Sequence, residues 1–210
     1  MRAFETAAFR AAFDALLAWR RDVRRFRPDP LPDGLLAALI ETAALAPSVG
    51  LSQPWRFARV RSEPARAAVR ADFARCNAAA LAGYDGEDGA RYAKLKLAGL
   101  SEAPEQLAVF CDHATAQGRG LGRQTMPEML DYSVVTAVHT LWLAARTRGV
   151  GVGWVSILDP EALRDVLATP PEWRLVAYLC LGFPEQDADE PELQRLDWER
   201  RAAAPIIIEL

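Results

Sequence analysis

The stretch Gly149-Val150-Gly151-Val152-Gly153-Trp154-Val155-Ser156-Ile157 decides the fold, because glycines alternate in it with β-branched and aromatic residues. This alternation predicts a β-strand over 150–157. The glycines share one face of that strand, so another group can approach the backbone there closely. That group is either a flat ligand or a tightly packed helix, and the sequence leaves both open. The pattern is not G-x-G-x-x-G and follows a predicted helix, so it does not support a dinucleotide site of the Rossmann type.

Helices and strands are predicted on both sides of this strand. The longest predicted helix is Pro127–Arg148, because proline suits a first turn and Gly149 a C-terminal stop. Asp159 is the expected N-cap of a short helix over 160–167. Further helices are expected over 4–19, 33–46 and 63–82, strands over 57–61, 106–111 and 174–181, and loops over 83–89 and 114–122. The irregular alternation of elements is typical of the α+β class, and the absence of a linker predicts one domain over 1–210.

The composition excludes several kinds of site and partner. The two histidines and three cysteines form no C-x-x-C or H-E-x-x-H pattern, so no metal site is expected. The net charge of −3 without a basic tail disfavours nucleic acid as a partner. No signal-like segment and no run of 18 uncharged apolar residues occurs, so we expect no membrane partner and a cytoplasmic location. An enzyme of this composition would take its hard chemistry from a cofactor.

The densest charge cluster is Arg20-Arg21-Asp22-Val23-Arg24-Arg25-Phe26-Arg27. Arginine binds phosphate through two parallel hydrogen bonds and keeps its charge at any working pH, so this stretch is a candidate phosphate site. The alternative is a solvated, ion-paired surface loop. Asp22 is either a counter-ion for the arginines or a base beside a bound anion.

Three other segments stand out. The loop Ala46–Trp55 holds Ser48 and Gln53, whose side chains can donate hydrogen bonds to a heterocycle, although a plain connecting loop would have the same residues. The glycine-rich run over 118–129 opens onto a helix N-terminus, a potential anion site. The apolar run Ile206–Ile208 either returns to the chain's own sheet or adds to the sheet of a partner subunit.

Taken together, these motifs resemble the flavin-binding nitroreductase fold from about residue 19 to 201. Ordinary nitroreductases usually carry serine in the place of Asp22 and asparagine in the place of Leu51. Asp22, together with the runs over 122–129 and 153–160, is similar to the 5,6-dimethylbenzimidazole synthase (BluB) family. Members of that family consume reduced FMN and O2 and produce the lower ligand of vitamin B12 and erythrose 4-phosphate.

The resemblance implies an α+β, nitroreductase-like architecture with a central mixed sheet flanked by helices. It implies a homodimer that exchanges C-terminal arms over about 190–210, and a flavin lid over about 84–100 with Tyr92, Leu95 and Leu97 as covers. Reduced FMN would be the substrate and O2 the co-substrate, and a separate NAD(P)H-flavin reductase would supply the reduced flavin. Asp22 and Ser156 would be catalytic. The flavin-binding residues would be Arg20, Arg21, Asp22, Val23, Arg24, Ser48, Gln53, Leu97, Val155, Ser156 and one C-terminal arginine, of which we take Arg195.

Two other functions remain compatible with the sequence. One is an NAD(P)H-dependent FMN nitroreductase or cob(II)yrinic acid a,c-diamide reductase, which would reduce its flavin directly with NAD(P)H. The other is a flavin-binding module without turnover. Asp22 favours the synthase, because a carboxylate near the ribityl hydroxyls can act as a base and a serine there cannot.

Overall fold

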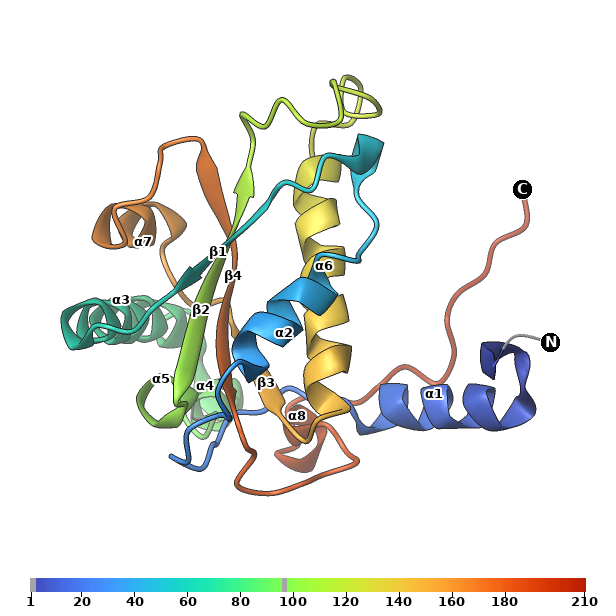
Figure 1. Ribbon diagram of the computed structural model, residues 1–210. Coiled ribbons are helices and arrows are strands. Elements are labelled where there is room, and N and C mark those ends of the chain that lie inside the picture. Colours follow the sequence, from blue (N-terminus) through green and yellow to red (C-terminus); the bar gives the residue numbers. More distant parts are fainter. Residues whose placement is uncertain (1–2, 96–97) are drawn as a thin grey trace.

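A four-stranded sheet forms the centre of the molecule in the computed structural model, which describes residues 3–95 and 98–210 (Figure 1). The strand order is β1-β2-β4-β3, and every neighbouring pair is antiparallel. An isolated parallel bridge joins Asp22 to Val152, so the parallel part of the predicted mixed sheet is confined to this bridge. The strands are β1 (Trp55–Arg59), β2 (Glu105–Asp112), β3 (Gly151–Val155) and β4 (Trp173–Gly182).

Helices cover both faces of the sheet (Figure 1). Alternate side chains of β2 point to opposite faces, with Val109 and Cys111 in one apolar cluster and Ala108 and Phe110 in the other. The first cluster packs under α2 (Leu35–Ala43) and α6 (Met129–Arg146). On the other face lie α3 (Glu63–Leu81) and α7 (Pro160–Val166). The remaining helices are α1 (Ala7–Trp19), α4 (Gly86–Tyr92), α5 (Gly99–Glu102), α8 (Glu192–Arg195) and the 3-10 turns Ala3–Glu5 and Val49–Leu51.

The glycine-lined face of β3 is covered by the chain itself. The backbone N–H of Val23 donates to the carbonyl of Val152 over 3.0 Å. A Cβ atom on Gly153 would lie 2.2 Å from the carbonyl oxygen of Val23, and one on Gly151 would lie 2.7 Å from a methyl group of Val23. Of the two expectations for this face, close packing is the one observed, although an extended segment packs there instead of a helix.

One predicted loop is wrong. The segment 83–89 was expected to be a loop because of its glycines, but α4 begins at Gly86 within it. Asp85 is the N-cap, Glu87 and Asp88 occupy the first turn and Arg91 the last, which matches the helix dipole at both ends. The charges at the ends of the segment therefore outweigh its glycines.

Two parts of the chain leave the body of the molecule (Figure 1). No residue of α1, which is described in full, is buried. In the tail, Ile206, Ile207 and Ile208 are 91%, 82% and 74% exposed. Within the described chain these isoleucines belong to no strand, so a return to the chain's own sheet is not observed. Among the described residues, no helix combines the length and the apolar character that crossing a membrane requires.

Candidate functional site

Asp22 is fixed at the free edge of the sheet. β3 is an edge strand, so one side of its backbone has no strand partner. The Asp22 carboxylate binds one group of this unpaired edge, because its Oδ1 accepts a 2.9 Å hydrogen bond from the backbone N–H of Trp154. Its Oδ2 lies 3.3 Å from Nε of Arg24. Two contacts from different elements therefore orient the carboxylate.

The surroundings of Asp22 change its acidity. Burial raises the pKa of this carboxyl above its ordinary value, and the hydrogen bond from Trp154 and the charge of Arg24 oppose the rise. The side chain still exposes 36% of its surface, so the protein encloses the group while leaving it open on one side. A carboxyl whose pKa is raised and which remains accessible is better suited to accept and return a proton than an ordinary surface aspartate.

The arginines of the 20–27 segment have different neighbours. Arg20 lies over the ring of Trp142, 4.9 Å from its centroid, and Nε of Arg21 donates to the carbonyl of Asp189 over 2.7 Å. Burial, and then the nearby charge of Arg201, lower the pKa of both arginines. Three guanidiniums that repel one another in this way form a local excess of positive charge, which favours binding of an anion.

A pocket of about 460 Å³ opens beside Asp22. Its basic residues are Arg24, Arg25, Lys94 and Arg195, and its acids are Asp22, Glu185, Glu190 and Glu192. The predicted residues Asp22, Val23, Arg24 and Arg195 all line this pocket. The structure therefore brings residues from the two ends of the chain to one cavity.

Ser156 and Val155 lie at the end of β3, beside this region. Ser156 is exposed and directly follows the last strand residue, whereas the side chain of Val155 is buried in the core. Ser156 is two positions beyond Trp154, the residue whose N–H binds Asp22, and this spacing corresponds to about 7 Å along an extended chain. Any role of Val155 in ligand binding would fall to its backbone.

Ser48 and Gln53 lie elsewhere. The loop that carries them contacts the first half of α6, since Ser133 Oγ accepts from the N–H of Val49. The Arg20–Arg24 segment contacts the second half, since Trp142 Nε1 donates to the carbonyl of Arg21. Nine residues of α6 separate these contacts, about 13 Å at 1.5 Å per residue. Figure 1 shows the two segments near opposite ends of α6, so within one chain they lie apart.

The loop with Ser48 and Gln53 borders a pocket of its own. Ser48 Oγ accepts from the N–H of Gln53 over 3.0 Å, and Gln117 donates to Oε1 of Gln53 over 3.0 Å. The adjoining pocket measures about 790 Å³ and is lined by Gly50, Leu51 and residues of the glycine-rich loop between 117 and 125. The loop over 46–55 and the glycine-rich run over 118–129 therefore line the same pocket.

The predicted lid is only partly described. Leu97 lies outside the described residues. Tyr92 is not a free cover, because its ring stacks on Tyr84 at 4.9 Å and contacts Trp198, while its hydroxyl donates to Asn77. Sequence reasoning missed Lys94 as a pocket residue. Lysine is rare in this arginine-rich chain, and this rarity could have marked Lys94 as a candidate pocket residue.

Comparisons with known proteins agree with one another. The model of the nitroreductase family matches residues 17–183. The chain is 57% identical to a 5,6-dimethylbenzimidazole synthase of Rhodospirillum rubrum over 95% of both chains, and 49% identical to one of Rhodobacter capsulatus over 90% of this chain and 92% of that one. A crystal structure of oxidised iodotyrosine deiodinase bound to FMN and 3-iodo-L-tyrosine shares the fold, with a TM-score of 0.73, 24% identity, and coverage of 93% of this chain and 97% of that one. A nitroreductase-like protein of Streptococcus mutans also shares the fold, with a TM-score of 0.68, 19% identity, and coverage of 95% and 99%.

Proposed function

The chain belongs to the nitroreductase family and, within it, to the 5,6-dimethylbenzimidazole synthases, and from this premise we propose that it fragments reduced FMN with O2. The products would be 5,6-dimethylbenzimidazole and erythrose 4-phosphate. The observation that carries the proposal is Asp22, a carboxyl with a raised pKa that is oriented by Trp154 and Arg24 at a pocket lined by four basic and four acidic residues.

The positive charge that a flavin phosphate requires would come from Arg20 and Arg21, which do not line the pocket but directly precede its lining residues Asp22–Arg25 in the sequence. Arg20 and Arg21 lie close enough to Arg201 for its charge to lower their pKa values, and burial adds to the effect. A dianionic phosphate would relieve this repulsion, and guanidinium groups match its geometry. Lys94 and Arg195, on other walls of the pocket, would add two further cations.

The protein's own chemical contribution would be small and local. Bound reduced FMN supplies the electrons for O2 and the carbon atoms of the product. Asp22 would take a proton from a ribityl hydroxyl and later return it, which its raised pKa favours. Ser156 would donate a hydrogen bond from the end of β3, and the segment over 84–100 would exclude water from the reaction.

The remaining flavin contacts would come from a second copy of the chain. Ser48 and Gln53 lie about 13 Å along α6 from the arginine segment, so they would serve the site of the partner subunit. The exposed apolar side chains of α1 and of the Ile206–Ile208 run are the surfaces that a homodimer with exchanged arms would bury. A separate NAD(P)H-flavin reductase would deliver reduced FMN.

The test is product formation from reduced flavin in air. The protein is incubated with FMN, NADH and an unrelated flavin reductase, and 5,6-dimethylbenzimidazole is measured by chromatography. We expect product with the wild type, none with Asp22→Asn and little with Ser156→Ala, while both variants still bind FMN. Asp29→Asn is the matched control, because Asp29 lies just beyond the cluster and pairs at the surface with Arg27.

Two outcomes would overturn the proposal. The first is a wild-type protein that forms no product although the flavin is fully reduced. The second is rapid bleaching of bound FMN by NAD(P)H without the helper enzyme, which would identify an NAD(P)H-dependent reductase. A wild-type yield from Asp22→Asn would remove Asp22 from the mechanism.

A further inference from the structure

Three possible metal ligands meet where β2 joins α6, outside both pockets described above. Cys111 lies near the end of β2 on the face that α6 covers, and His113 is the first residue after the strand. Asp131 lies in the first turn of α6, above that face. One ligand atom of each residue lies within 4.8 Å of the other two.

The ligand atoms of these residues lie close to the spacing of a metal's first shell, one pair within it and the others within 4.8 Å. Nε2 of His113 lies 3.1 Å from Oδ1 of Asp131. The sulfur of Cys111 lies within 4.8 Å of the ligand atoms of both His113 and Asp131. In a tetrahedral zinc site with bonds of about 2.0–2.3 Å, neighbouring ligand atoms are separated by about 3.3–3.7 Å. Side-chain adjustments of about an ångström would therefore convert the three residues into a coordination shell.

The donor set is selective. A thiolate, an imidazole and a carboxylate combine soft, borderline and hard ligands, which suits Zn²⁺ and not Mg²⁺ or Ca²⁺. Three protein ligands leave a fourth tetrahedral position for water. His113 exposes about a third of its side chain, which provides a route of entry, whereas Cys111 is fully buried.

We propose that Cys111, His113 and Asp131 bind a zinc ion that links β2 to α6. On binding, the thiol proton of Cys111 passes to solvent and a thiolate–zinc bond forms, with no change of oxidation state. The site is independent of the flavin reaction proposed above. No motif in the sequence indicates it, because two ligands form a bare C-x-H and the third comes 18 residues later from another element.

The charges around the site lower its affinity for a metal ion. NH1 of Arg174 lies 3.2 Å from Oδ2 of Asp131, whereas His113 contacts Oδ1. This guanidinium is 68% exposed, so it can remain on Oδ2 or turn into solvent while Oδ1 coordinates the ion. Asp112 does not join the site, since Arg56 holds its Oδ2 at 2.6 Å. A positive neighbour weakens cation binding, so we expect an affinity below that of a four-cysteine site.

The experiment uses cobalt(II) as a spectroscopic probe on the full chain without a histidine tag. Cobalt titration should produce a thiolate-to-metal charge-transfer band and the visible bands of tetrahedral coordination, saturating at one ion per chain. Zinc should displace the cobalt and raise the melting temperature of the wild type through binding to the native state. Cys111→Ser should abolish the charge-transfer band, and His113→Ala and Asp131→Asn should weaken binding by about tenfold or more.

The control variants are Cys76→Ser and Cys180→Ser, which remove the other two thiols and should leave the cobalt spectrum unchanged. His113→Ala alters a partly exposed side chain, so it keeps the test decisive if Cys111→Ser fails to fold. The proposal is overturned if the wild type shows no charge-transfer band at saturating cobalt. It is overturned equally if the band persists in folded Cys111→Ser or disappears in Cys76→Ser.

Discussion

Gly153 leaves no room for a side chain beside the segment that holds Asp22. A Cβ atom at this position would lie 2.2 Å from the carbonyl oxygen of Val23, and that carbonyl is backbone and cannot turn aside. The neighbouring N–H of Trp154 binds Asp22, so any displacement of the segment also moves the carboxylate. The glycine is therefore needed for the position of the proposed base.

We expect Gly153→Ala to lower the free energy of unfolding by about 1–3 kcal/mol, as overpacking usually does. It should also reduce product formation more than Ser156→Ala does, because the whole Asp22 segment shifts. Urea unfolding and the product assay measure the two effects. Gly83→Ala is the control, because Gly83 is exposed after α3 and its Cβ would lie 3.3 Å from the nearest backbone oxygen, so it should change both much less. A Gly153→Ala protein with wild-type stability and yield would show that the segment is not packed as described.

The raised pKa of Asp22 predicts how the stability of the protein depends on pH. Its folded pKa is raised, so from about pH 4, the ordinary aspartate value, up to the raised value, the native state holds a proton that the unfolded state has lost. Over that window wild-type stability falls with rising pH because of this group. Asparagine cannot ionise, and its amide oxygen still accepts the hydrogen bond from Trp154.

Asp22→Asn should therefore gain stability relative to the wild type as pH rises through that window, with a constant difference above it. The lost ion pair with Arg24 should offset only about 0–1 kcal/mol of this gain. Urea unfolding at several values between about pH 4 and pH 8 measures the difference. Asp29→Asn, which removes a carboxylate from a surface ion pair with Arg27, is the control variant in the same measurement. A variant that becomes steadily less stable than the wild type toward pH 8 would contradict the raised pKa.

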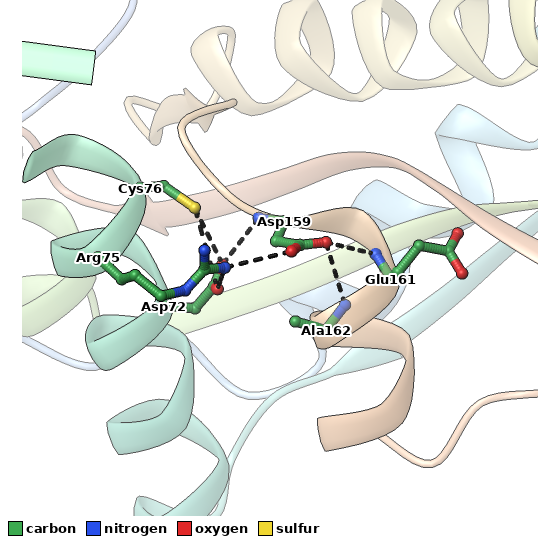
Figure 2. Close-up of polar contacts among 6 residues, drawn as sticks. All are labelled: Asp72, Arg75, Cys76, Asp159, Glu161 and Ala162. Atoms are coloured by element: carbon green, nitrogen blue, oxygen red, sulfur yellow. Dashed lines mark hydrogen bonds and ion pairs between the residues drawn. The ribbon is translucent and has the colours of Figure 1, made fainter. Parts of the chain in front are cut away.

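At the scale of elements, α3 and α7 are joined by a polar cluster (Figure 2). Asp72 on α3 is 8% exposed and accepts a 2.8 Å hydrogen bond from the backbone N–H of Asp159. Arg75 lies between the two carboxylates, 2.5 Å from Asp72 and 3.2 Å from Asp159. Asp159 in turn caps α7 by accepting from the N–H groups of Glu161 and Ala162.

Replacing Asp72 with alanine should leave the N–H of Asp159 without its acceptor. We expect Asp72→Ala to lower the free energy of unfolding by about 1–3 kcal/mol, the usual effect of an unsatisfied buried polar group. Chemical denaturation measures it. Asp165→Ala, an exposed aspartate on α7, is the control and should cost much less. If the two variants were equally stable, the cluster would be a surface network of little energetic weight.

The sequence predictions were accurate where a feature depends on residues close together in the chain. The Asp159 cap is confirmed, and α3 (Glu63–Leu81) lies within one residue of the range 63–82 predicted from its helical composition. Asp22, Arg24 and Arg195 do meet at one pocket. The packing of Val23 onto Gly153 could not be predicted, because it joins segments 130 residues apart by shape alone. The separation of Ser48 from Asp22 depends on the length of α6 and not on any local pattern.

At the scale of the whole molecule, α1 exposes apolar side chains that a soluble monomer would ordinarily cover. Phe9, Phe13 and Leu17 are 48%, 43% and 37% exposed, and they share one side of the helix. Exposed rows of this kind mark interfaces. We expect a homodimer in which α1 packs against the second copy.

Phe13→Glu should weaken that dimer, since it places a charge in an apolar contact. Light scattering after size-exclusion chromatography should show a dimer for the wild type and a monomer, or a concentration-dependent mixture, for the variant. Asp14→Lys on the same helix changes charge without removing an apolar contact, and it should remain dimeric. A wild type that elutes as a monomer at micromolar concentration would contradict the assignment of α1 to an interface.

The separation of the two groups of predicted flavin residues has a consequence that only a dimer can show. The first group, around Asp22, and the second, Ser48 and Gln53, lie at opposite ends of α6. Each site would then take the first group from one chain and the second group from the other. Two chains with substitutions in different groups can therefore form one intact site in a mixed dimer. We therefore expect Asp22→Asn and the double variant Ser48→Ala/Gln53→Ala, each inactive alone, to recover product formation after mixing and subunit exchange.

The expected recovery follows from symmetry. A mixed dimer has one site with both lesions and one site with neither, and random exchange makes half of all dimers mixed, so about a quarter of wild-type activity should return. Asp22→Asn mixed with Ser156→Ala is the control, because both lesions lie in the first group and every site of the mixed dimer keeps one of them. No recovery in the first mixture, with exchange confirmed by mass spectrometry, would mean that each chain builds its site alone. Ser48 and Gln53 would then have to move along α6 toward Asp22, or lie outside the site altogether.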